Sequence, residues 1–405
     1  MTVIPDDLAR RLDAAVDADE LVRACQRLVR IPSLSRQEEA VAKEFAAILG
    51  ELGFDEVELD RHHNVVGRLA GSGSGPCLMV NGHLDHVPPG AMADPYSAAI
   101  VDGARWGEPG PAIYGRGTCD MKCNVAAAAF AVGVLRRAGI ALRGDIVLVA
   151  DIAEEIDSPD GVKSVIESGV TADYGLSVEA TRLGVYLGHR GKVEYELTVA
   201  GRTSHSSEPS RGVNAIYLAQ PLIAALREHA ASLPEDPVMG GATLAVTQIA
   251  SSPSGGVPVV PDRCVVRVDR RYLPGETPDQ VSLELEALVS RLAREVDGFA
   301  CDVSLVNHYP LMHIPPDHAL VAAARAARRL VRDDDPAPAA WRFGVNGTFM
   351  AAAGIPTVGL GPGDEAYAHT PEEHVPIGDL VEAVRIYVRF YGLVCGTVDG
   401  ERSAL

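Results

Sequence analysis

The sequence of 405 residues contains no long apolar run and no surplus of basic residues. No segment approaches the roughly 18 uninterrupted apolar residues of a membrane-spanning helix. The first residues, Met-Thr-Val-Ile-Pro-Asp-Asp, lack the basic and apolar regions of a signal peptide. The formal net charge of −19 argues against binding to nucleic acid or to an anionic membrane surface. We therefore expect a cytoplasmic protein with neither kind of partner.

Paired cysteines, repeats and a dinucleotide-binding turn are also missing. The seven cysteines are odd in number and scattered, which fits reduced thiols in the core of a cytoplasmic protein. Cys119 and Cys123 lie four positions apart, but no second cysteine pair completes a structural zinc site. No G-x-G-x-x-G opens a helix after the first strand, which argues against an NAD-type Rossmann enzyme.

Composition and periodicity predict two domains, the first of the α/β class. Apolar residues make up 47% of the chain and charged residues 22%, which is typical of globular proteins, and the length favours two domains. Ser35 and Glu38 predict an N-cap with a capping box for the second helix. The predicted helices span 19–30, 36–52, 124–139 and 161–168, the predicted strands span 56–60, 64–69, 77–81, 144–151 and 173–178, and a Gly/Pro-rich loop spans 87–112.

The pattern changes near residue 188. Lys192–Ala200 alternates apolar and polar residues, as half-exposed antiparallel strands do. A helix, two strands, a helix and a last strand follow, in the order of a ferredoxin-like α+β unit, over 213–231, 242–250, 263–270, 277–296 and about 300–306. Helices over 317–333 and 377–394 and a strand over 356–360 complete the chain. We expect a mixed-sheet catalytic domain over 1–187 and 303–405, interrupted by an inserted α+β domain over 188–302.

Residues suited to metal binding stand at the ends of the predicted strands. His83 and Asp85 are two positions apart at such an end, so both side chains project to the same side. This arrangement suits an imidazole ligand and a carboxylate that orients its ring. Further along the chain come Asp120, Glu154, Glu155, Glu179 and His369. Crevices in α/β sheets lie outside the carboxyl ends of strands, and this N/O set suits a divalent metal such as Zn²⁺, Co²⁺ or Mn²⁺.

Six motifs together resemble the M20 metallopeptidase family, which includes acetylornithine deacetylase, succinyl-diaminopimelate desuccinylase, aminoacylase-1 and carboxypeptidase G2. The motifs occur in the family's order over about 60–375. They are Gly82-His-Leu-Asp85, Tyr114-Gly-Arg-Gly-Thr-Cys-Asp-Met-Lys122, Ala153-Glu-Glu155, Glu179, Gly201-Arg-Thr-Ser-His205 and Ala368-His-Thr-Pro371. Other stretches, such as Gly188-His-Arg-Gly191, look closest to a poorly characterised subgroup of hydrolases associated with selenium metabolism. The resemblance implies a zinc-peptidase-like catalytic domain with an inserted lid or dimerisation domain.

The resemblance also implies a role for each matching residue. Asp120 would bridge two divalent metal ions, Zn²⁺ first and Co²⁺ or Mn²⁺ as alternatives, with a cis peptide bond to Met121. His83 and Glu179 would complete the protein ligands of one metal, and Glu155 and His369 those of the other. Asp85 would fix the tautomer of His83. Glu154 would be the general base, taking a proton from the metal-bridging water.

The inserted domain supplies further candidates. By resemblance, His205 would stabilise the tetrahedral oxyanion in the active site of a partner subunit, which implies a homodimer. An edge strand and the helix 213–231 are candidates for the dimer contact. Asn214, Arg271 and Gly347 are candidate substrate-binding residues. Arg271 matches a family arginine that can hold a substrate carboxylate, but an ordinary salt bridge within a strand explains it equally well.

Three departures from the family pattern bear on specificity: Cys123 stands where glycine is usual, Pro258 where asparagine is frequent, and His86 where threonine is common. His374 is expected at the surface. The leading hypothesis is hydrolysis of the amide bond of an N-acyl amino acid or short peptide. The alternatives are a hydrolase of a carbamate or ring amide with the same site, and a non-catalytic binding protein on the same fold.

Overall fold

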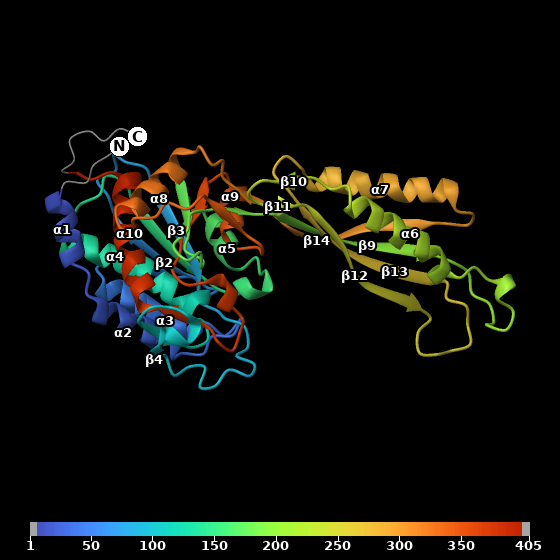
Figure 1. Cartoon of the computed structure of the whole chain (residues 1–405), viewed down its shortest axis with the longest axis horizontal. Coiled ribbons are helices and arrows are strands. Elements are labelled where there is room, and N and C mark those ends of the chain that lie inside the picture. The colour runs from blue at the N-terminus through green and yellow to red at the C-terminus, as the bar shows by residue number, and fades with distance from the viewer. Residues whose placement is uncertain (1–5, 399–405) are drawn as a thin grey trace. The chain divides into compact units, whose positions relative to one another are not determined.

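The computed structural model describes residues 6–398 and divides into two compact units (Figure 1). The first unit contains the described chain up to Gly188, then Met312–Ala340, and the chain from Val345 onward. The second unit contains His189–Leu311 and Trp341–Gly344. An α+β unit is therefore inserted into an α/β unit.

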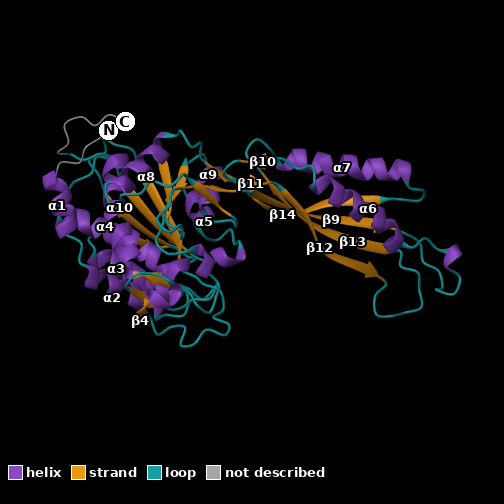
Figure 2. Ribbon diagram, in the orientation of Figure 1, coloured by secondary structure: helices purple, strands orange, loops and turns teal. Residues whose placement is uncertain are grey.

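The first unit is built on a mixed nine-stranded sheet (Figure 2). Its order is β1 (Glu56–Leu59), β2 (Val65–Leu69), β6 (Ile146–Asp151), β3 (Leu78–His83), β7 (Tyr174–Ser177), β17 (Thr357–Gly359), β8 (Tyr186–His189) and β15 (Met312–His313), with β16 (Ala339–Trp341) also paired to β8. The central strands β6, β3, β7 and β17 are parallel. They are buried at almost every position, as expected of strands covered on both faces.

Helices cover both faces of this sheet. They are α1 (Asp6–Ala14), α2 (Ala18–Val29), α3 (Glu39–Glu51), α4 (Cys123–Arg137), α5 (Val162–Glu167), α8 (Ala319–Arg329), α9 (Gly347–Ala352) and α10 (Ile377–Cys395). Met79, Val147 and Val149 pack on one face against residues of α5 and α9. Helix α4, whose small residues allow close packing, is buried on the other face with α10 and α2. The segment Thr118–Arg137 passes a length and hydropathy test for a membrane span, and its most apolar 18-residue stretch lies fully buried inside the protein.

A small three-stranded sheet replaces much of the loop predicted over 87–112. Strands β4 (Ala99–Asp102) and β5 (Pro111–Tyr114) form a hairpin with a short 3₁₀ helix, η1 (Gly103–Trp106), in its connection. Strand β18 (His374–Pro376) pairs with β5. The prediction of a plain loop was wrong because β4 and β5 are short and partly exposed, and β18 lies far away in sequence.

The second unit has the predicted ferredoxin-like order. It contains β9 (Gly191–Ala200), α6 (Ala215–Ala230), β12 (Thr243–Ser252), β13 (Arg263–Tyr272), α7 (Pro278–Glu295) and β14 (Cys301–Tyr309), with a small β10 (Glu235–Asp236) and β11 (Gly240–Gly241) pair. The four long strands are antiparallel in the order β12-β13-β9-β14. Alternate residues of β9 and β13 are buried in a core with α6 and α7. Helix α7 begins with a capping box formed by Thr277 and Gln280.

The predicted capping box at Ser35 and Glu38 is not formed. Helix α3 begins at Glu39, and its N-cap residue, Glu38, makes no side-chain capping bond. The Ser35 hydroxyl donates instead to Asp85 Oδ2 at 2.7 Å, and Glu38 Oε1 accepts from the backbone N–H of Ala153 at 3.0 Å. Both side chains therefore support the residues at the strand ends rather than the helix.

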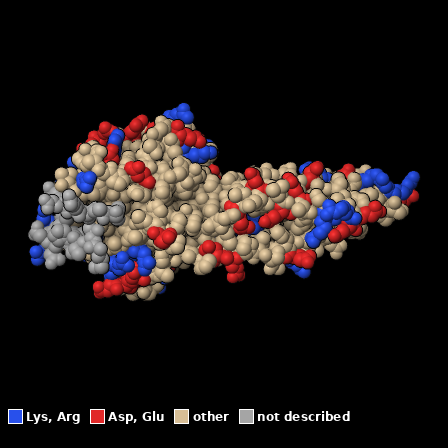
Figure 3. All heavy atoms as spheres, turned by 90° about the horizontal axis from the view of Figure 1, so that it is seen from above, with Lys and Arg blue, Asp and Glu red and all other residues tan. Residues whose placement is uncertain are grey.

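Charged side chains of both signs are spread over the surface. On the face drawn in Figure 3, the acidic and basic side chains of the described residues are interspersed. Interspersed charges of this kind promote solubility.

Candidate metal centre

The candidate residues of the first unit meet at the carboxyl ends of its parallel strands. His83 is the last residue of β3, and Glu179 follows the end of β7 by two positions. Strand β6 ends at Asp151, after which Glu154 and Glu155 open a short 3₁₀ turn, η3 (Glu154–Ile156). Since the parallel strands end at one edge of the sheet, residues far apart in sequence come together there.

Asp120 lies between the two histidines. Its Oδ1 atom is 3.0 Å from His83 Nε2, and its Oδ2 atom is 3.0 Å from His369 Nε2. On the far side, His369 Nε2 lies 2.9 Å from Glu155 Oε2. The ligand atoms of His83, Asp120 and Glu155 all lie within 4.8 Å of one another. The peptide bond from Asp120 to Met121 is cis. The Asp120 carboxylate faces the two imidazoles through different oxygen atoms.

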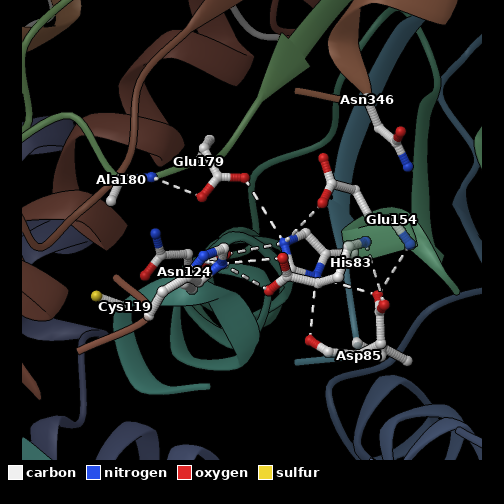
Figure 4. A network of polar contacts seen from close by, with 12 residues as sticks. His83, Asp85, Cys119, Asn124, Glu154, Glu179, Ala180 and Asn346 are labelled. Atoms are coloured by element: carbon white, nitrogen blue, oxygen red, sulfur yellow. Dashed lines mark hydrogen bonds and ion pairs between the residues drawn. The ribbon is translucent and has the colours of Figure 1, made fainter. Parts of the chain in front are cut away.

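Two further carboxylates approach His83 from different sides (Figure 4). Glu179 Oε2 lies 3.8 Å from His83 Nε2, and Glu154 Oε2 lies 3.9 Å from the same atom. The other ring nitrogen, Nδ1, lies 3.1 Å from the backbone oxygen of Asp85 and 3.3 Å from its Oδ1 atom. Contacts to Nδ1 of this kind leave Nε2 as the nitrogen free to bind a metal.

Asp85 connects three separate segments. Its Oδ1 atom accepts from the backbone N–H of Glu154 at 3.1 Å, and its Oδ2 atom accepts from the backbone N–H of Glu155 at 3.3 Å. The hydroxyl of Ser35 donates to the same Oδ2. Burial acts to raise the pKa of Asp85, but its contacts with His83 and Ser35 bring that pKa below the usual range. Asp85 is therefore an ionised, immobile carboxylate.

The crowded acidic groups carry an electrostatic cost that bound cations would relieve. Burial raises the pKa of Glu154 and of Glu179 well above the usual range, and the neighbouring carboxylates add to the effect. The contacts with Asp120 and Glu155 raise the pKa of His369 to about 10. Burial opposes protonation of His83, yet the carboxylates around it raise its pKa well above the usual value. Such a site takes up protons or cations, and its two imidazoles and several carboxylates are a donor set that fits divalent metals.

A buried ion pair behind Asp120 was missed by the sequence analysis. Arg116 and Glu373 are paired in the interior, with 2% and 0% of their side chains exposed. Glu373 Oε1 accepts from the backbone N–H of Asp120 at 3.3 Å, and Arg116 Nη2 donates to the backbone oxygen of Thr370 at 3.2 Å. The pair thus joins the loops that carry Asp120 and His369. Arg116 and Glu373 lie 257 positions apart in the sequence, so no local pattern indicated that they would pair.

His86, one of the departures from the family pattern, is a structural residue. Its Nε2 atom accepts from the backbone N–H of Ser33 at 3.0 Å, and its Nδ1 atom donates to the backbone oxygen of Val87 at 2.8 Å. Burial lowers the pKa of His86 to about 4, so the ring is neutral at physiological pH. Its two hydrogen bonds therefore fasten the segment before α3 to the end of β3.

The expectation that His374 lies at the surface was wrong. Its side chain is buried, stacks on Trp106 and donates from Nδ1 to the backbone oxygen of Glu372 at 2.7 Å. Cys119 and Cys123 are buried free thiols.

The remaining substrate-binding candidate of the first unit, Gly347, opens helix α9. A Cβ atom there would lie 2.9 Å from Met312 Sδ, so the position is closely packed. Its neighbour Asn346 is also buried and donates to Asp151 Oδ2 at 2.5 Å.

Three candidates lie in the second unit. His205 is exposed in the loop after β9, with Nδ1 2.7 Å from Ser207 Oγ. Asn214 is the N-cap of α6 and accepts from the backbone N–H of Ile216. Arg271 pairs with Asp269 in β13 at 2.8 Å. This is the salt bridge within a strand that was expected as the alternative to substrate binding. Burial and the nearby guanidinium groups of Arg271 and Arg342 lower the pKa of Arg190, so positive charge is concentrated here.

Comparison with known proteins agrees with this geometry. The profile of the peptidase family M20/M25/M40 matches residues 79–392. The chain is 32% identical to the uncharacterised protein YgeY of Escherichia coli K12, covering 91% of this chain and 93% of that protein. It is 31% identical to acetylornithine deacetylase of Myxococcus xanthus, covering 82% of this chain and 84% of that enzyme.

Solved structures share the fold. Aminopeptidase PepT of Bacillus cereus aligns with a TM-score of 0.74 at 21% identity, over 94% of this chain and 99% of its own. YXEP of Bacillus subtilis, described as a dinuclear metal-binding peptidase, aligns with a TM-score of 0.72 at 18% identity, over 94% and 99%.

Proposed function

This chain belongs to the peptidase family M20/M25/M40, and from that premise we propose that it is a two-metal amidohydrolase that cleaves the amide bond of an N-acyl amino acid or short peptide. Family membership makes it a metal-dependent hydrolase of the peptidase and deacylase kind. The observation that carries the finer proposal is the position of Asp120, which faces His83 through one oxygen and His369 through the other.

Each metal position has its own protein ligands in this proposal. Asp120 belongs to both, His83 and Glu179 complete one, and Glu155 and His369 complete the other. The distances of 3.8 Å from Glu179 to His83 and 2.9 Å from Glu155 to His369 support this division. We propose Zn²⁺ as the metal, because imidazole and carboxylate ligands suit it, with Co²⁺ or Mn²⁺ as alternatives. When bound, the ions would polarise the substrate carbonyl and lower the pKa of the attacking water.

Glu154 is the general base. It takes a proton from the attacking water and later passes a proton to the leaving amine. Its backbone is held by Asp85, and its Oε2 atom lies 3.9 Å from His83 Nε2, which puts the carboxylate beside the proposed metal position. Burial raises the pKa of Glu154, so that uptake of a proton costs it little. Asp85 keeps His83 in the tautomer that presents Nε2.

The second unit supplies the remaining groups. His205 stabilises the oxyanion in the active site of a partner subunit, and its exposure leaves it accessible for that role. Arg271 holds a substrate carboxylate, supported by the positive charge of its neighbours, and Asn214 contributes to substrate binding. Gly347, in the first unit, also contributes to substrate binding.

We propose a homodimer formed through the second unit, at the edge strand β12 and helix α6. Strand β12 ends the sheet order β12-β13-β9-β14, so one of its edges is unpaired within the sheet. Ile249 on β12 is 51% exposed and Tyr217 on α6 is 74% exposed, so both side chains are accessible to a partner subunit. The seven free cysteines, all in the described part of the chain, support a cytoplasmic location.

Metal content and turnover test the proposal separately. Metal-free enzyme is reconstituted with Zn²⁺ and screened against N-acyl amino acids and dipeptides, with bound zinc measured for each variant. We expect two zinc ions per chain, and Glu154→Ala should keep them yet lose turnover. Glu167→Ala, which changes an exposed carboxylate of α5, is the matched control and should behave like the wild type. Unchanged turnover in Glu154→Ala would refute the assignment of the base, and a single zinc ion per chain would refute the two-metal site.

A further inference from the structure

The β4–β5 hairpin lies against the loop that carries His369. Strand β5 pairs with β18, which begins at His374, five residues after His369. The hairpin connection contains η1 and ends its short helical turn at Trp106. The hairpin therefore contacts the proposed ligand loop through strand β5 and through the side chain of Trp106.

Trp106 contacts the loop both with its ring and with its indole nitrogen. Its ring stacks on His374 with 3.6 Å between ring centroids and 8° between ring planes. Its Nε1 atom donates to Glu372 Oε2 at 2.8 Å. Arg105 reinforces both contacts, since its guanidinium lies 4.3 Å above the Trp106 ring and its Nη2 atom lies 2.5 Å from the same Glu372 oxygen. Tyr367 closes the cluster with its ring 4.4 Å from that of His374.

His369 depends on its backbone for its position. Its φ of 62° lies in the left-handed region of the backbone, which residues other than glycine seldom adopt. Its side chain is 52% exposed, and its contacts with Asp120 and Glu155 are those of the proposed metal position itself. Surrounding packing must therefore hold the loop in this conformation.

Two hydrogen bonds hold the loop between His369 and the residues that Trp106 contacts. Tyr114 donates its hydroxyl to the backbone oxygen of Pro371 at 3.1 Å, and Arg116 donates to that of Thr370 at 3.2 Å. A polar cavity of about 170 Å³ adjoins His374 and is also lined by Glu108 of the hairpin and Asp379 of α10. Trp106 packs on His374 beside this cavity and so adds a constraint to those that Tyr114 and Arg116 supply.

From these contacts we propose that Trp106 is a positioning residue for His369. The hairpin contacts Glu372 and His374 through Trp106, and it thereby sets the affinity of the metal position that His369 completes. This inference rests on the proposed two-metal function. Trp106 touches neither a metal ligand nor, in this proposal, the substrate. It acts through the backbone between His369 and His374.

The experiment is a calorimetric titration of metal-free protein with Zn²⁺, which reads each metal position without measuring turnover. Trp106→Leu removes both the stacking and the hydrogen bond, and we expect it to weaken one of the two zinc positions by about 10-fold, as loss of a group that orients a ligand does. Trp106→Phe keeps a stacking ring and should restore part of the affinity. Ile100→Ala removes an exposed side chain of the same hairpin and should leave both positions unchanged.

A second background identifies which position responds. His369→Ala should abolish the position that His369 completes, and adding Trp106→Leu to it should then leave the remaining zinc affinity unchanged. An equal weakening of both positions by Trp106→Leu, a weakening that persists without His369, or no weakening at all would overturn the positioning role. If the wild type binds fewer than two zinc ions, or if Asp120→Asn binds zinc as the wild type does, the two-metal proposal itself fails. Circular dichroism verifies that each variant is folded. If Trp106→Leu does not fold, the variants Trp106→Phe and Glu372→Gln replace it in the zinc titration.

Discussion

The buried ion pair between Arg116 and Glu373 yields a prediction about stability. Arg116→Met removes the guanidinium but keeps most of the side-chain volume. The Glu373 carboxylate then stays in the interior with the backbone N–H of Asp120 as its remaining donor at 3.3 Å. Loss of one partner of a buried pair costs about 3–5 kcal/mol of unfolding free energy, because the other charge remains uncompensated.

A second substitution should recover much of that loss. Adding Glu373→Gln replaces the carboxylate with a neutral amide, whose oxygen can still accept from the backbone N–H of Asp120. The two substitutions together therefore leave no buried charge. We expect the double variant to be more stable than Arg116→Met alone by about 2 kcal/mol, with the cost of the missing Thr370 contact remaining. The exposed pair of Arg136 and Asp55 is the matched control, and Arg136→Met should cost at most about 1 kcal/mol.

The assay is hydrogen exchange measured by mass spectrometry on peptides of α4, in metal-free protein. This helix lies in the first unit, so its opening free energy reports on that unit even when the two units unfold separately. Burial raises the pKa of Glu373, and without the opposing charge of Arg116 the shift grows. The pKa of Glu373 is about 8 in the wild type and higher in Arg116→Met, so only the variant keeps losing stability as pH rises above about 8. The deficit of Arg116→Met should therefore be larger at pH 9 than at pH 6. A deficit below about 1 kcal/mol, or no recovery on adding Glu373→Gln, would refute the reasoning.

Two further predictions concern His205 and His86. His205→Ala should fold and dimerise normally but lose about 100–1,000-fold in kcat, as measured by turnover alongside light scattering; a fully active monomer of the wild type would contradict a role supplied by the partner. His86, whose pKa burial lowers to about 4, stays neutral in the folded protein while the unfolded chain takes up a proton below about pH 6.5. Stability should therefore fall on acidification from about pH 6.5 to 4, by at most about 3 kcal/mol, and denaturant titrations should find this contribution missing from His86→Gln.

Local patterns were enough to predict the central elements. The apolar runs at 77–81 and 144–151 indicated buried strands because parallel strands covered on both faces need apolar residues at every position. The alternation over Lys192–Ala200 predicted an antiparallel strand for the same physical reason, applied to a sheet with one covered face. Placing the acidic residues after strands then predicted that they would meet, since parallel strands end at one edge.

Long-range contacts could not be predicted in this way. Ser35 has the local pattern of a helix cap, yet its hydroxyl binds Asp85, 50 positions away. His374 was expected at the surface, and nothing near it in sequence indicated that Trp106 would stack on it. The β4–β5 hairpin was missed because its strands are short and partly exposed, and because β18, the other partner of β5, is distant in sequence. Capping patterns and polarity describe only the neighbourhood along the chain.

The four contacts of Asp85 have a consequence for how such a site can diverge. One carboxylate sets the tautomer of His83, supports the turn bearing Glu154 and Glu155, and is itself held by Ser35. Replacing it would disturb a proposed ligand and the proposed base together. A single change at Asp85 therefore cannot alter one and leave the other as it is, which constrains how such a site can diverge.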